Sequence, residues 1–196
     1  YRSQIKFGDN NQFADSVLTS TNIYVQNNKL INDFSSKDQV HALYLNYSNQ
    51  IKDFGYQVGL RGEDARLNTY LDGYTLNVLS TAAGEIHYKR IYPSVFLTQK
   101  LKGEQQVQVS YTRRVNRPRP WETNPFLDVS DPLTYRAGNP NFLPEDVHSF
   151  ELCYTKYWKK VTLTSSLYYR KTNDVIQRVR RLPNSSGIMT TYPPNL

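Results

Sequence analysis

Apolar and polar side chains alternate with a period of two along several stretches of this sequence. In residues 106–114, Val107, Val109 and Tyr111 fall on one side of an extended chain, and glutamine, serine, threonine and arginine fall on the other. This alternation predicts β-strands with one apolar and one polar face, because successive side chains of a strand point to opposite faces. On this basis we expect strands over residues 41–51, 55–66, 92–101, 105–116, 148–157 and 161–172.

The spacing between the expected strands alternates between short and long. Short turns fall at 52–54, 102–104 and 158–160, whereas polar stretches run through 8–36, 68–91 and 117–147, and a fourth runs from 173 toward 189. Long loops are uncommon in compact soluble domains but normal in outer-membrane barrels, which have short periplasmic turns and longer extracellular loops. The strand lengths also match the roughly 9–11 residues that a tilted strand needs to cross a bilayer. The pattern therefore predicts an all-β fold: a segment of an antiparallel up-and-down transmembrane β-barrel, with about seven or eight strands of a larger barrel and long extracellular loops.

The alternation also predicts which side chains face lipid and which face the barrel lumen. A barrel with a polar interior presents apolar side chains outward and polar side chains inward. Val107, Val109, Leu163 and Leu167 are therefore expected to face lipid. The lumen-facing candidates are charged side chains of the opposite set: Arg61, Glu63, Arg114, Glu151 and Arg170.

The composition supports an ordered β-protein. Aromatic residues make up 13% of the chain and include 16 tyrosines, which disfavours global disorder. Tyrosine and tryptophan near strand ends favour the lipid headgroup level, where an apolar ring and a polar tip are both satisfied. The alternative is that tyrosine is simply a good strand former. The residues concerned are Tyr47, Tyr111, Tyr154, Tyr157, Trp158 and Tyr169.

The net charge of +7 and the pI of about 9.4 raise nucleic acid as a partner. The basic residues are scattered, however, with short clusters only at 113–114, 159–160 and 178–181. No basic helix, zinc-finger spacing or aromatic RNA-binding signature accompanies them. We therefore expect no nucleic-acid partner, and assign the positive charge to turns and loop rims.

Catalytic and metal-binding motifs are missing from the sequence. Cys153 is the single cysteine, which excludes an intrachain disulfide and a cysteine-based zinc site. His41, His87 and His148 have no metal-ligand spacing with one another. No nucleophile elbow or phosphate-binding loop is present. We expect neither an enzyme nor a cofactor, and the longest apolar runs fall far short of the roughly 20 residues of a transmembrane helix.

A series of motifs resembles a known family. The sequence SYTRRVNRP at 110–118 is followed by NPF at 124–126, GNPNFLPE at 138–145 and SFEL at 149–152. Upstream, YQVGLRGE at 56–63 and YPS at 92–94 add to it. This order resembles the signature of the Bacteroidetes outer-membrane β-barrel family, which is similar to the C-terminal barrel of TonB-dependent receptors. The resemblance covers roughly residues 38–180 on motif matching, with one departure, an additional apolar Phe142 before Leu143.

The resemblance implies a fragment of a TonB-dependent transporter in the bacterial cell outer membrane. The intact protein would be a barrel of roughly 22 strands with a plugged lumen. It would bind a nutrient (a chelated metal, a glycan or a peptide) and import it with energy delivered by TonB. Residues 1–196 would be a partial barrel domain, with the plug domain and the remaining strands outside this sequence. The implied partners are outer-membrane lipid and lipopolysaccharide, TonB through the plug domain, and a surface lipoprotein.

The stretch 117–147 is expected to form part of the extracellular substrate mouth. It carries most of the signature, and its prolines and Asn-Pro pair predict a structured loop. Aromatic and arginine side chains commonly anchor ligands, which makes Arg119, Trp121, Tyr135 and Arg136 the substrate-facing candidates. The alternative is that Trp121 packs the loop onto its neighbours, while Arg119 and Arg136 pair with lipopolysaccharide phosphates.

Two other function classes stay open at this point. One is a non-transporting outer-membrane barrel with an assembly or surface-adhesion role. The other is a soluble β-rich binding domain. A plug domain elsewhere in the protein would separate the transporter from the first, and detergent dependence would separate it from the second.

Overall fold

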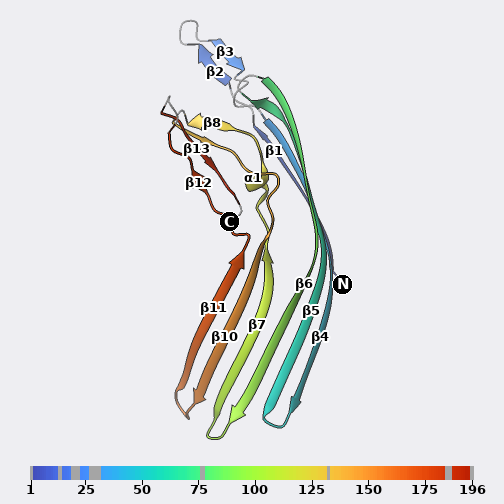
Figure 1. The fold of residues 1–196 in the computed structure, drawn as a ribbon, viewed down its shortest axis with the longest axis vertical. Coiled ribbons are helices and arrows are strands. Elements are labelled where there is room, and N and C mark those ends of the chain that lie inside the picture. The colour runs from blue at the N-terminus through green and yellow to red at the C-terminus, as the bar shows by residue number, and fades with distance from the viewer. Residues whose placement is uncertain are drawn as a thin grey trace.

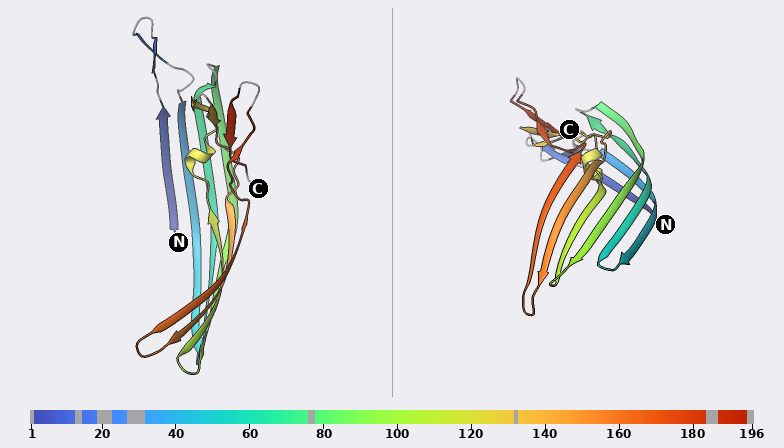
Figure 2. Two further views of the ribbon diagram at one scale, coloured as in Figure 1. Left: turned by 90° about the vertical axis from the view of Figure 1, so that its left-hand side faces the viewer. Right: turned by 60° about the horizontal axis from the view of Figure 1, so that its bottom comes forward.

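The chain forms one curved antiparallel sheet, seen in a computed structural model that describes residues 2–12, 15–18, 23–26, 32–75, 78–131, 133–183 and 187–194 (Figures 1 and 2). Seven strands pair in the order β1-β4-β5-β6-β7-β10-β11, so neighbours in the sheet follow one another along the chain. This arrangement confirms the expected up-and-down wall of a barrel, with β1 and β11 at its two edges. The strands are β1 (Arg2–Gln12), β4 (Asn32–Ile51), β5 (Phe54–Thr75), β6 (Val78–Leu101), β7 (Gln105–Asn116), β10 (Glu145–Tyr157) and β11 (Thr162–Asn173).

Three tight turns join the strands at one end of the sheet, at the bottom of Figure 1. They fall at 52–53, 102–104 and 158–161, close to the predicted positions. The second turn requires a left-handed backbone at Gly103, with φ of 76°, which glycine adopts without steric cost. Each turn fixes the register of the hairpin that it closes, and that register runs unbroken from the turn along β4 and β5 and along β10 and β11.

The central strands are much longer than predicted. Strands β4, β5 and β6 contain 20, 22 and 24 residues. The stretch 68–91, expected to be an extracellular loop, instead continues β5 to Thr75 and begins β6 at Val78. The loop prediction was therefore wrong there, because it ended each strand where the apolar residues change from one parity to the other.

Cross-strand register sorts the side chains onto two faces of the sheet. Arg61, Arg114 and Glu151 lie on the face that we call concave, and Val58, Val109 and Leu152 lie on the opposite, convex face. On the part of the sheet near the turns, the convex face is an exposed apolar band and the concave face is mostly polar. Exposed members of the band are Leu43, Leu45, Tyr47, Ile51, Phe54, Val58, Leu60, Ile91, Leu97, Leu101, Val109, Phe150, Leu152, Leu163, Leu167 and Tyr169.

The two faces exchange character toward the other end of β4, β5 and β6. The concave face there carries the buried side chains, including Phe34, Ala65, Leu71 and Ile86. The convex face carries charged side chains instead, and the Asp64 carboxylate lies 2.8 Å from Nε2 of His87 and 3.3 Å from Nζ of Lys89. The hydrophobic core of the molecule therefore lies on the concave side, at the end far from the turns.

Smaller elements gather beyond the large sheet. β2 (Asp15–Leu18) and β3 (Ile23–Gln26) form a two-stranded hairpin. A four-stranded sheet has the order β12-β13-β9-β8, with β13 parallel to β9. Its strands, together with the short helix of the same region, are β8 (Asp128–Asp131), β9 (Thr134–Arg136), β12 (Val179–Arg180), β13 (Met189–Tyr192) and α1 (Pro120–Thr123).

Candidate functional site

The signature loop, residues 117–144, folds back onto the concave face instead of projecting away from the sheet (Figure 1). Phe126 from this loop packs against Phe34 of β4 and Leu71 of β5 and is only 5% exposed. Phe142, the additional apolar residue in the signature, is fully buried. Burying two phenylalanines stabilises the loop by about 3–6 kcal/mol at the usual 1.5–3 kcal/mol for each side chain. The loop is thus structured, as its prolines predicted, and it also packs into the core, which the prolines did not predict.

Two glycines allow the loop to approach its neighbours this closely. A Cβ atom at Gly138 would lie 2.4 Å from the Glu122 carbonyl oxygen and 2.5 Å from that of Asn124. A Cβ atom at Gly84 of β6 would lie 2.8 Å from Cβ of Pro140. Glycine is therefore required at Gly138, the first residue of the GNP motif, and at Gly84, which contacts the proline of that motif.

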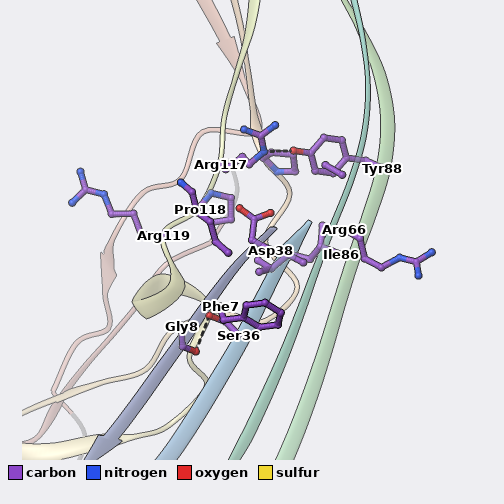
Figure 3. Close-up of a pocket in the computed structure, with 14 residues that line it drawn as sticks. Phe7, Gly8, Ser36, Asp38, Arg66, Ile86, Tyr88, Arg117, Pro118 and Arg119 are labelled. Atoms are coloured by element: carbon purple, nitrogen blue, oxygen red, sulfur yellow. Dashed lines mark hydrogen bonds between the residues drawn. The ribbon is translucent and has the colours of Figure 1, made fainter. Parts of the chain in front are cut away.

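An ion cluster ties the beginning of the loop to the wall. The carboxylate of Glu63, with a side chain that is 0% exposed, pairs with Arg61 at 2.6 Å and with Arg117. Arg117 also donates from Nε to the Tyr88 hydroxyl at 2.9 Å (Figure 3). Removing one partner of a buried ion pair costs about 3–5 kcal/mol, because the other charge stays buried without compensation. Two separate motifs, GLRGE and NRP, thus meet in one contact.

The surroundings of Arg117 form a small cavity of about 420 Å³ that β1, β4, β5, β6 and the loop enclose. Asp38, Tyr88 and Pro118 lie at this cavity, whereas the guanidinium of Arg119 points away from it (Figure 3). Burial lowers the pKa of the Arg117 guanidinium, Arg61 acts in the same direction, and the Asp38 carboxylate opposes both. The cavity lies where the loop packs against the sheet, and charged side chains such as Asp38 and Arg117 line it.

A second ion cluster lies where the backbone pairing of β6 with β7 ends. The ladder between these strands ends at the pair Ser94 and Thr112, next to Pro93, which has no N–H to donate. Beyond it, the carboxylate of Asp146 accepts hydrogen bonds from Nε of Arg113 at 2.9 and 3.0 Å. Arg90 of β6 lies 3.7 Å from the same carboxylate. Side chains therefore join the two strands where backbone hydrogen bonds stop.

The five charged residues predicted to face a lumen all lie on the concave face. Register places Arg61 and Glu63 of β5, Arg114 of β7, Glu151 of β10 and Arg170 of β11 on that side. Glu63 is buried under the signature loop, whereas Arg114, Glu151 and Arg170 are exposed in a shallow hollow of about 380 Å³. The structure thus gathers these residues on one surface, in two different environments.

The four substrate-facing candidates are not gathered in one place. Arg119 is the exposed N-cap of α1, and Trp121 belongs to that helix. Tyr135 and Arg136 lie next to each other on β9, so they point to opposite faces of the four-stranded sheet. Arg136 lines a second cavity near the loop.

This cavity, of about 680 Å³, lies between one face of the four-stranded sheet and the segments of the signature loop that flank β8 and β9, including Phe126 and Gly138. Arg136, Arg178 and Arg180 line it together with Asp128 and Thr191. The sequence had shown the basic cluster at 178–181, but as charge on a separate loop. Only the parallel pairing of β13 with β9 brings it beside the signature loop, and nothing in the local pattern indicates that pairing.

Some chemistry is not found in the part of the chain that the structure describes. No group of three or more histidine, cysteine, aspartate or glutamate side chains there could hold a metal ion. No helix among the same residues is long and apolar enough to cross a membrane.

Solved structures similar to this chain include a siderophore receptor and a ferric enterobactin receptor. The crystal structure of the siderophore receptor PirA from Pseudomonas aeruginosa matches with a TM-score of 0.52 and 12% identity, over 99% of this chain and 44% of that one. A variant of the ferric enterobactin receptor (PfeA) from Pseudomonas aeruginosa, in complex with enterobactin, gives a TM-score of 0.50 and 9% identity, over 98% and 36%. At these identities the likeness shows the fold, and the chain spans less than half the length of either receptor.

Sequence comparison gives the family directly. No curated protein matches the chain. The model of the outer membrane protein β-barrel family matches residues 2–196, nearly the whole sequence. The expected outer-membrane location and the receptor-like barrel wall are confirmed. The chain belongs to the outer membrane protein β-barrel family.

Proposed function

We propose that this chain forms part of the wall and the extracellular mouth of a TonB-dependent nutrient transporter. The observation that carries the proposal is the signature loop packed on the concave face, at the end of the strands opposite the short turns. A loop folded there lies across the path of any molecule that enters a barrel from outside. The protein is then a receptor for import and not an enzyme.

The convex band is the lipid contact in this proposal. It carries exposed leucine, valine and aromatic side chains on β4, β5, β6, β7, β10 and β11. In water such an exposed apolar surface would be a liability for a monomer, but an outer-membrane barrel presents an apolar band about 25 Å tall to the bilayer. Tyr111, Phe150 and Tyr169 form a row across three strands, with ring centroids 4.8 and 6.2 Å apart, and this row would be part of a girdle of aromatic residues.

The concave face is the lumen in this proposal. Arg114, Glu151 and Arg170 would face water or a plug domain, and the buried Arg61–Glu63–Arg117 cluster would hold the signature loop against the wall. The turns at Asp53, Gly103 and Lys159 would then face the periplasm. TonB would act through a plug domain, and the surface partners would be lipopolysaccharide and a lipoprotein of a Bacteroidetes cell.

The mouth of the transporter would include Arg119, Trp121, Tyr135 and Arg136. Functional residues concentrate on loops that a rigid scaffold holds, and buried Phe126 and Phe142 provide that scaffold here. The nutrient would be a chelated metal, a glycan or a peptide.

The test uses the intact gene in its own host. We expect deletion of the receptor gene and deletion of tonB to abolish growth on the same limiting nutrient, in a panel of ferric chelates, oligosaccharides and peptides. Restoring the full-length receptor should restore growth, and Arg136→Ala should lower uptake at normal surface levels. Unchanged growth on the whole panel, together with lost adhesion or a leaky outer membrane, would instead support a non-transporting barrel.

A further inference from the structure

The four-stranded sheet presents a row of polar side chains whose role is unassigned. Arg180, Thr191, Arg136 and Asp128 are successive partners across β12, β13, β9 and β8. Paired residues on neighbouring strands point to the same face of a sheet. All four residues therefore lie on one face, and all four line the cavity of about 680 Å³.

The charge of this cavity is unbalanced. Among the lining residues that the structure describes, three carry a guanidinium group, Arg136, Arg178 and Arg180, and one carries a carboxylate, Asp128. Arginine binds carboxylate and phosphate groups through two parallel hydrogen bonds, and is preferred wherever such groups are recognised. The hydroxyl of Thr191 adds a donor between Arg180 and Arg136. The volume falls within the roughly 300–1,000 Å³ of small-molecule sites.

Backbone hydrogen bonds hold the strands that carry Arg136 and Arg180. The amide of Arg181 donates to the Thr190 carbonyl at 2.8 Å. The amide of Ala137 donates to the Thr191 carbonyl at 3.1 Å, and the amide of Gly138 donates to the Asn124 carbonyl at 2.8 Å. Arg136 and Arg180 stand two strand spacings apart, about 10 Å between backbones. Two guanidinium groups at this separation suit a molecule with two oxyanion groups better than a single small ion.

We infer that this cavity binds a soluble organic anion with two or more carboxylate or phosphate groups, and that Arg136 and Arg180 are its main binding residues. The inference names the substrate class of the transporter proposed above and rests on that function. Lipopolysaccharide offers phosphates too, but the cavity adjoins the concave side of the sheet, because Phe126 both lines it and packs against Phe34 of the concave face. Lipid would contact the convex side.

The test measures ligand binding to the full-length receptor in lipid nanodiscs by calorimetry. The probes are citrate and pyrophosphate, with maltose as the neutral comparison and vesicles containing lipid A as the lipid source of phosphate. Arg136→Gln and Arg180→Gln should each weaken citrate or pyrophosphate binding by about tenfold or more, the usual effect of losing a charge-assisted hydrogen bond. The matched control is Arg181→Gln, because Arg181 follows Arg180, stacks on the Tyr192 ring at 4.7 Å and does not line the cavity.

The outcomes separate this inference from the proposed function. Saturable binding of either anion that both substitutions weaken and the control leaves unchanged supports the inference. No binding of either anion, equal binding by all variants, or binding of lipid A vesicles alone overturns it. Nutrient uptake that requires TonB but is unaffected by Arg136→Gln and Arg180→Gln would overturn the inference and leave the transporter standing. Arginine-dependent anion binding without any uptake would support the binding site and overturn the proposed transport function.

Discussion

The two halves of strands β4, β5 and β6 carry their apolar side chains on opposite faces of the sheet, although the backbone is continuous. Near the turns, Leu45 points to the convex side and is 68% exposed. Eleven positions earlier in the same strand, Phe34 points to the concave side and is 2% exposed. The apolar side chains have moved from the outside of the sheet to the inside.

The exchange happens without a break in the ladder. The register of β4 and β5 runs from Ile51 and Phe54 to Asn32 and Gly73 with no bulge. A one-residue slip would also swap the faces, but no slip is needed, since the residue types themselves change parity. The proposed barrel would explain the change: toward the turns the outside would be lipid, whereas toward the loops the outside would be water and the signature loop covers the inside.

The largest expected effect comes from removing the side chain that anchors the loop. Phe126→Ala should destabilise the packed loop by about 3–5 kcal/mol, the range for truncating a buried phenylalanine. Hydrogen exchange in the full-length receptor reports on it directly, because the amides of Gly138 and Asn139 donate to carbonyls of Asn124 and Glu122. Both amides should lose protection in this variant. Leu45→Ala is the control, and unchanged protection in Phe126→Ala would mean that the loop is held elsewhere.

A charge on the convex band tests the other half of the comparison. Val109→Arg should destabilise the folded barrel by about 2–4 kcal/mol if the position lies near the middle of the bilayer. The neighbouring change Gln108→Arg adds the same side chain on the concave face and should cost little. Refolding into lipid vesicles with a urea titration compares the two. The faces are assigned wrongly if Gln108→Arg is the damaging one.

The sequence predicted the half near the turns well. Alternation marked Val107, Val109, Leu163 and Leu167, and register places all of them on the convex face. It also gave the turn at Gly103 and the up-and-down order of the sheet. In a membrane barrel, the outward side chains within the bilayer are apolar, so the local alternation is sufficient to predict the faces of this half.

The other half depends on contacts that a local pattern does not contain. Ala65 and Leu71 break the parity of Val58 and Leu60. Leu71 packs against Phe126 of the signature loop, and Ala65 lines the cavity beside Arg117 and Pro118. The cluster of Glu63 and Arg117 joins two motifs separated by more than 50 residues. The same holds for the cavity arginines, which long-range strand pairing alone brings together.

A smaller effect is expected from adding one methyl group. Gly138→Ala places a Cβ atom 2.4 Å from the Glu122 carbonyl oxygen, so the loop must shift. Overpacking of this kind costs about 1–3 kcal/mol. Gly62→Ala is the matched control, because a Cβ atom there meets nothing within 4 Å. Proteolysis of the loop in intact cells should increase in Gly138→Ala only, and equal resistance of the two variants would show that the close approach is not required.

Spin labels along the convex side of β5 test the exchange of faces most directly. With Cys153 first replaced by serine, single cysteines at Val58, Leu60, Asp64 and Arg66 carry the label in the full-length receptor in lipid vesicles. We expect labels at 58 and 60 to collide with oxygen dissolved in lipid, and labels at 64 and 66 to collide with a water-soluble nickel chelate. The same collision pattern at all four positions, whether lipid or water, would contradict the account.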